Sequence, residues 1–98
     1  MPRPKKFRCV ECKPDATYFK PRAIPMTALE EISLSMDELE AMRLADYEMF
    51  YHADAARKME ISRQTFGRIL REAHKKVSEC LLNGKALRIE TKEKGEIR

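Results

Sequence analysis

The chain has 98 residues, of which 43% are hydrophobic and 37% charged, and its formal net charge is +4. This length allows one small domain, and the composition is typical of a compact helical domain rather than of a disordered chain. No apolar run is long enough to span a membrane, and no apolar stretch follows the basic start "MPRPKKFR" as it would in a secretory signal. Three cysteines, an odd number, fit a reducing compartment better than a disulfide framework. A cytoplasmic protein without membrane partners is therefore expected.

The charges are unevenly distributed along the chain. Residues 1–22 and 57–76 are rich in Lys and Arg, whereas residues 30–48 are rich in Asp and Glu. Two basic segments flanking an acidic one indicate a polarised surface, and a basic face favours a polyanionic partner. Ordinary solvated helix faces would give a similar charge pattern, so charge alone does not decide between the two interpretations.

The N-terminal third is expected to be mostly extended. Residues 1–16 contain three prolines among basic and small residues, which predicts a basic extended arm. The sequence "TYFKP" at 17–21 has β-favouring residue types and predicts a short strand that stops at Pro21. Pro25 suits the first turn of a short helix that would continue through "MTALEE" to residue 31.

The first long helix has a strong start signal. Ser35 followed by Glu38 forms a capping-box pattern, and Leu34 and Leu39 have the spacing of a hydrophobic staple around it. Apolar residues then recur at helical spacing. A helix over about residues 36–48 is predicted.

Two further helices follow in close succession. The sequence "ADAARKM" predicts a helix over about residues 52–59, with small residues that allow close packing. Ser62 begins the next helix, and Ile61 and Phe66 repeat the staple spacing. This helix is expected to run to about Leu82, where "NG" supplies a left-handed stop.

The C-terminal end is expected to be extended again. "KALRIE" at 85–90 predicts a short strand that could pair with residues 17–21, within one chain or between two. Residues 91–98 are expected to form a flexible tail. The predicted fold is therefore a mainly α domain of three or four helices over residues 17–90, with short extended segments at both ends.

The helix over 62–82 has two chemically distinct faces. At 100° per residue its apolar side chains form one stripe, composed of Phe66, Ile69, Leu70, Ala73, Val77 and Cys80. Gln64, Arg68, Arg71 and Lys75 share the opposite side, and Gly67 lies at its edge, where a missing side chain allows close approach. Arginine can bond a guanine edge, and glutamine can bond an adenine edge. Lysine and arginine also neutralise phosphates. These residues predict a DNA-recognition helix.

The residues before this helix support that interpretation. A short helix with Ala55 and Ala56, a tight connection, and then Phe66 and Ile69 on the next helix have helix-turn-helix spacing. Ile61 would fill the turn, and Phe66 and Ile69 would pack under the first helix of the pair.

At this point the chain resembles a small uncharacterised prokaryotic family of predicted DNA-binding proteins, whose helix-turn-helix is similar to that of sigma factor region four. The matching segments are "MPRP" at the start, "TYFKP", "IP" and "LEE" at 24–31, "ELEAMRLAD" at 38–46, "AA" at 55–56, "SRQTFGRIL" at 62–70 and "NGKALRIE" at 83–90. The resemblance implies DNA binding. The sequence as a whole favours a DNA-binding protein that regulates transcription. The sequence departs from the expected pattern at Met49, Tyr51 and Glu60, where glycine, a capping serine and glycine are expected. A somewhat different turn geometry is therefore anticipated.

The expected DNA contacts are divided between the helix and the arm. Gln64, Arg68 and Arg71 are expected to contact bases, and Arg63 and Lys75 the phosphate backbone. Ser62 is expected to cap the helix and bond a phosphate. In the arm, basic residues would enter the minor groove; they are Arg3, Lys5 and Lys6.

Two other function classes remain open from the sequence. The long helix could form a dimer seam or bind another regulator, making the protein an adaptor or dimerisation module without specific DNA affinity. Cys9 and Cys12 have the spacing of half a zinc site or of a redox pair, and a metal or redox sensor is the third class. No bound metal, cofactor or catalytic set is expected, so the protein is not expected to be an enzyme. Double-stranded DNA is the expected partner, and a homodimer is left open.

Overall fold

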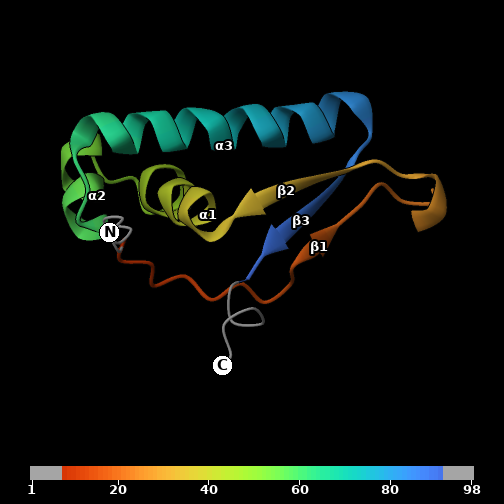
Figure 1. The fold of residues 1–98 in the computed structure, drawn as a ribbon, viewed down its shortest axis with the longest axis horizontal. Coiled ribbons are helices and arrows are strands. Elements are labelled where there is room, and N and C mark those ends of the chain that lie inside the picture. The colour runs from red at the N-terminus through yellow and green to blue at the C-terminus, as the bar shows by residue number, and fades with distance from the viewer. Residues whose placement is uncertain (1–7, 92–98) are drawn as a thin grey trace, which may run out of the picture.

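The computed structural model describes residues 8–91, in which three α-helices pack against a small sheet (Figure 1). The helices are α1 (Met36–Met42), α2 (His52–Met59) and α3 (Arg63–Asn83), and the strands are β1 (Tyr18–Phe19), β2 (Glu31–Ser35) and β3 (Ala86–Glu90). The arm cations Arg3, Lys5 and Lys6 lie outside the described residues, as does the expected tail beyond Thr91. The fold is mainly helical but includes a true sheet.

The helix boundaries follow the predicted capping signals. The hydroxyl of Ser35 accepts a bond of 3.1 Å from the Glu38 N–H, and the Glu38 carboxylate accepts one of 2.9 Å from the Ser35 N–H. The hydroxyl of Ser62 accepts from the Thr65 N–H at 3.0 Å. At its other end α3 stops at Gly84, which has the left-handed φ of 66°. The predicted starts at Ser35 and Ser62 and the stop at "NG" are confirmed.

The helix expected over residues 36–48 has two parts. Regular α1 passes into a π-helical segment, Arg43–Tyr47, in which the hydrogen bonds span one residue more. The segment ends just before Met49, which has a φ of 64°. Met49 therefore adopts the left-handed conformation for which glycine was expected.

The sheet corrects the predicted fold. The central strand β3 pairs antiparallel with β1, as expected for the two short strands, and the pairing lies within one chain. However, β3 also pairs in parallel with β2, which places Leu34 beside Ile89. The helix expected over residues 25–31 is only a single 3₁₀ turn, Met26–Ala28, after which the chain extends into β2. The segment before Ser35 is too short to form a stable helix. Its pairing with β3 supplies hydrogen-bond partners for the backbone N–H and C=O groups of β2 instead.

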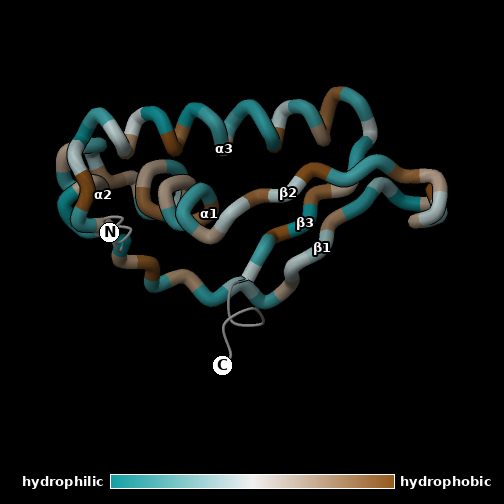
Figure 2. Tube along the Cα trace, viewed as in Figure 1, coloured by the Kyte–Doolittle hydropathy of each residue, from teal (hydrophilic) through white to brown (hydrophobic). Residues whose placement is uncertain are grey.

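Two apolar clusters hold the elements together. The larger joins α1, α2 and the first half of α3, and its buried members are Ala41, Leu44, Ala55, Ala56, Met59, Phe66, Ile69 and Leu70. The smaller joins Leu34 of β2, Ala73 of α3 and Ile89 of β3. The predicted apolar stripe of α3 is confirmed as its inner side, with Val77 only half-buried. Figure 2 shows that hydrophilic residues predominate along α3, with hydrophobic residues recurring among them.

Residues 8–16 have no regular secondary structure but are fixed to the helices. The Cys9 N–H donates to the Met59 carbonyl at the end of α2, at 3.0 Å. The Arg8 guanidinium pairs with Asp37 at 2.8 Å. This part of the arm therefore packs against the domain before it reaches β1 (Figure 1).

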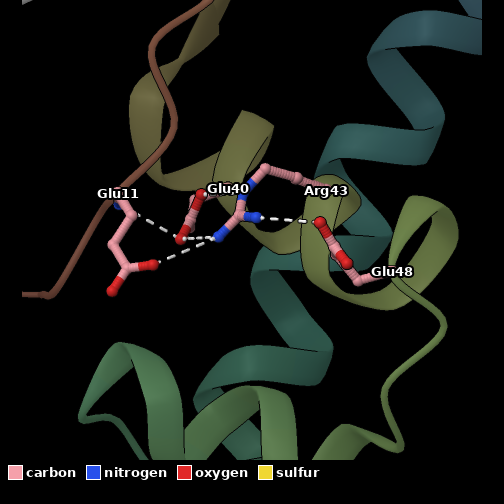
Figure 3. A network of polar contacts seen from close by, with 4 residues as sticks. All are labelled: Glu11, Glu40, Arg43 and Glu48. Atoms are coloured by element: carbon pink, nitrogen blue, oxygen red, sulfur yellow. Dashed lines mark hydrogen bonds and ion pairs between the residues drawn. The ribbon is translucent and has the colours of Figure 1, made fainter.

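The arm crosses a buried carboxylate on α1. Glu40 is only 2% exposed and accepts bonds of 2.8 and 2.9 Å from the Arg43 guanidinium (Figure 3). The Glu11 N–H of the arm donates to the same carboxylate at 3.2 Å, and Arg43 also contacts Glu48 at 3.2 Å. Burial alone would raise the pKa of Glu40, but the bonds from Arg43 and from the arm hold this pKa below its ordinary value. The charged network therefore attaches the arm to α1.

Candidate nucleic-acid interface

A three-residue connection joins α2 to α3. Glu60 follows α2 in the left-handed conformation, with φ 62° and ψ 42°. Its N–H donates to the Arg57 carbonyl at 3.1 Å, and the Ile61 N–H donates to the Ala56 carbonyl at 3.0 Å. This pair of bonds is the Schellman motif, in which glycine is the usual left-handed residue. The turn geometry is therefore the common one, and Glu60 adopts it at a cost of roughly 1 kcal/mol.

Close packing fixes the angle between α2 and α3. Ala55, Ala56 and Met59 of α2 are buried in the same cluster as Phe66 of α3, which is fully buried. The His52 ring meets the Phe66 ring edge-on, with 5.3 Å between the centroids. The small residues allow the two helices to approach, as the sequence predicted.

The outer face of α3 presents the predicted polar residues. Gln64, Arg68, Arg71 and Lys75 are all exposed, and so is Arg63 in the first turn. Helical spacing places Gln64, Arg68, Arg71 and Lys75 in one row along the helix. The structure thus brings together the expected side chains of the helix. We call this row, together with Arg63, the outer face of α3.

The cations of the outer face differ from most others in their pairing. No ion pair between described residues includes Arg63, Arg68, Arg71 or Lys75. Elsewhere basic side chains do pair, for example Lys76 with Glu38 at 2.8 Å on the inner edge of α3, and Arg57 with Asp54 at 2.6 Å on α2. The outer face therefore has positive charge that no ion pair within the described residues neutralises.

Gly67 and Ser62 complete the surface near the start of α3. A Cβ atom added to Gly67 would meet nothing within 4 Å, so the described fold does not require glycine there. Ser62 is exposed, and besides capping the helix its hydroxyl donates to the Thr65 hydroxyl at 2.9 Å. The capping role predicted for Ser62 is confirmed, and a phosphate contact stays a prediction.

The cysteines are free thiols in the structure. Cys9 and Cys12 are half-buried, and Cys80 is buried on α3. Burial raises the pKa of Cys12 and the charge of Glu40 raises it further, although Arg43 opposes this. Thiols with a raised pKa are weaker nucleophiles and weaker metal ligands at neutral pH. Over residues 8–91 no group of three or more His, Cys, Asp and Glu side chains is arranged to hold a metal ion.

Among the polar contacts that were not anticipated from the sequence, two connect separate elements. One is the network around Glu40, and the other joins His74 of α3 to Asp46 of the π-helical segment, with 2.7 Å between Nε2 and Oδ2. The spacing of Glu40 and Arg43 is a readable signal for a helical ion pair. Nothing local in the sequence indicates that the arm buries this pair. No helix in the described residues is long and apolar enough to cross a membrane.

Comparison with known proteins places the chain in a family. Residues 1–97 match the family described as "Protein of unknown function DUF134". A UPF0251 protein of Desulfosudis oleivorans is 53% identical over 92% of this chain and 65% of its own length. Another, of Prosthecochloris aestuarii, is 51% identical over 90% of this chain and 57% of its own length. A third, of Caldanaerobacter subterraneus, is 49% identical over 92% of this chain and 76% of its own length.

The chain thus spans less than two thirds of the length of the first two of these relatives. No solved structure matches it. The chain belongs to the DUF134 family, with relatives that carry the name UPF0251 protein.

Proposed function

We propose that the protein binds double-stranded DNA in a sequence-specific manner and regulates transcription. In this proposal α2 and α3 form a helix-turn-helix of the kind found in sigma factor region four. The N-terminal half of α3 enters the major groove. The observation that carries the proposal is the set of cations on the outer face of α3 that form no ion pair with another residue of 8–91.

The electrostatic argument depends on the contrast with the rest of the surface. Six of the ten other Lys and Arg side chains in the described residues form ion pairs, and α3 also has an exposed carboxylate, Glu72, one turn from Arg68. The outer face instead combines Arg63, Arg68, Arg71 and Lys75 without an ion-pair partner among the described residues. Such a surface fits the phosphate backbone, whose bound counterions are released when the protein binds.

The local geometry supports entry into a groove. Three residues separate α2 from α3, and the inner side of α3 is packed under α2, so only the outer side is available to a duplex. A Cβ atom added to Gly67 would meet nothing within 4 Å in the described fold, and its missing side chain leaves room for the DNA backbone or base edges. In this arrangement Gln64, Arg68 and Arg71 contact bases, while Arg63 and Lys75 contact phosphates. Ser62, beside the first turn, bonds a phosphate.

The N-terminal arm is proposed to add minor-groove contacts. Cys9 is fixed to the Met59 carbonyl at the end of α2, beside the connection to α3. Arg3, Lys5 and Lys6 belong to the basic segment that precedes Cys9 in the sequence. Basic arms of this composition are suited to the narrow, electronegative minor groove.

Arg68→Ala is expected to weaken binding to a preferred DNA site by about 1–3 kcal/mol and to relax preference at one base pair. The free energy of unfolding of this variant should change by no more than about 0.5 kcal/mol, because the Arg68 side chain is exposed. The matched control is Arg88→Ala on β3, which removes the same charge from an exposed side chain away from α3. Fluorescence anisotropy with duplex DNA measures both affinities. Equal losses for the two variants would show that only net charge matters, and the proposed recognition face would be wrong.

A further inference from the structure

The C-terminal end of α3 borders an apolar hollow. The hollow has a volume of about 310 Å³ and lies between α3 and the strands β1 and β3. Its apolar lining consists of Phe19, Pro21, Val77, Cys80, Leu81 and Leu87. Phe19 and Leu81 are 53% and 78% exposed, and the neighbouring Leu82 is 82% exposed. Two consecutive leucines on the helix surface, beside an apolar hollow, form an exposed apolar patch rather than a single scattered residue.

We propose that this face, the hollow together with Leu82, seats a second copy of the same chain. A two-fold dimer requires a surface that is complementary to itself, because each partner presents the same residues. Here a protruding leucine and an apolar hollow lie side by side, so each copy can offer Leu82 to the hollow of the other. This arrangement would remove both exposed leucines from water in a single contact.

The charges around the hollow are compatible with self-association. Lys85 lines the hollow and is paired with Glu79 at 2.6 Å and with Glu30 at 3.3 Å, and the second lining cation, Lys20, bonds the Pro21 carbonyl at 2.9 Å. The two cations and the two carboxylates sum to zero charge, so two copies can approach without strong repulsion. The outer face near the start of α3 instead has cations that pair with no carboxylate in the part of the chain that the structure describes, so two copies would repel each other there.

The hollow lies at the opposite end of α3 from the proposed DNA-binding residues. Helix α3 has 21 residues, and a helix of this length spans about 30 Å. Contact at its C-terminal end would therefore leave the N-terminal half of each copy accessible. If the proposed function holds, such a dimer would present two recognition helices to two half-sites of one duplex. The association itself does not depend on DNA binding.

Sedimentation equilibrium of the full chain without DNA tests this inference. The wild-type protein is expected to form a reversible dimer between about 1 μM and 1 mM. Leu82→Glu should raise the dimer dissociation constant by about thirtyfold or more, because it places a charge in the apolar contact. Tyr47→Glu is the matched control, since Tyr47 is 81% exposed, lies outside the hollow, and should leave dimerisation unchanged.

Circular dichroism should show wild-type helical content for both variants. If the Leu82→Glu variant loses helical content, the Leu82→Gln variant is measured in its place. Leu82→Gln adds no charge and should also weaken the dimer. A wild-type chain that stays monomeric over the whole range would overturn the proposal and assign the hollow to a different occupant. A dimer that neither Leu82 variant weakens would overturn it as well, by placing the contact elsewhere.

Discussion

Glu40→Gln is expected to lower the free energy of unfolding by about 3 kcal/mol or more, because it removes one member of a buried ion pair. Glu40 is 2% exposed, and its carboxylate accepts two bonds from Arg43 and one from the Glu11 N–H. A neutral amide cannot compensate the partly buried guanidinium to the same extent. Because Glu11 belongs to the arm, amide hydrogen exchange in residues 8–16 should also become faster. Urea unfolding followed by circular dichroism measures the main effect.

Glu48→Gln provides the matched control for this prediction. It makes the same chemical change in another partner of Arg43, at 3.2 Å, but Glu48 is exposed. Exposed pairs contribute about 1 kcal/mol or less, so this variant should stay close to the wild type. Equal losses of stability in the two variants would show that burial does not make Glu40 more important for stability than the exposed Glu48.

The effect of Glu40 should also depend on pH. Its folded pKa lies below the ordinary value of 4.5, so its charged form stabilises the fold. This contribution is fully present above pH 4.5 and is lost as the pH falls through the folded pKa. The difference in stability between the wild type and Glu40→Gln should therefore narrow in acid.

Phe66→Ala should lower the free energy of unfolding by about 3–5 kcal/mol, because it opens a cavity between α2 and α3. Phe66 is fully buried among Ala55, Ala56 and Met59. Phe19→Ala makes the same substitution at a side chain that is 53% exposed, and it should cost clearly less. Urea denaturation of both variants gives the comparison. If Phe66→Ala were as stable as the wild type while Arg68→Ala unfolded the domain, the inner and outer sides of α3 would have been assigned the wrong way round.

The helices could be predicted from the sequence because their signals are local. Ser35 with Glu38, Ser62, and Gly84 after Asn83 each act within a few residues of the helix end that they determine. The division of α3 into two faces follows from its period in the same way. For the same reason the outer face could be identified before the structure, although its lack of ion-pair partners could not.

The strand β2 could not be predicted because its partner is distant. "EISLS" pairs in parallel with β3, more than fifty residues later, and this pairing depends on the tertiary fold. Local residue types favoured a helix before it, whereas the structure has only the turn Met26–Ala28. Burial of Glu40 was missed for a similar reason, because the covering arm comes from a different part of the chain.

Met49 and Glu60 show where pattern and geometry differ. Glycine was expected at both positions, and both have positive φ values, 64° and 62°. The backbone therefore keeps the conformation that glycine would favour, although the residue types differ. The expected change in turn geometry was wrong at Glu60, because the Schellman hydrogen bonds hold the residue in place.

Selection from a pool of random duplex DNA by the full chain is the most direct test of DNA recognition by α3. At about 50 mM salt we expect one sequence motif to be enriched, because Gln64, Arg68 and Arg71 are placed to contact base edges. The Arg68→Ala variant should lose preference at one position of that motif. A recovered pool that keeps its random composition at this salt concentration would contradict sequence-specific DNA binding.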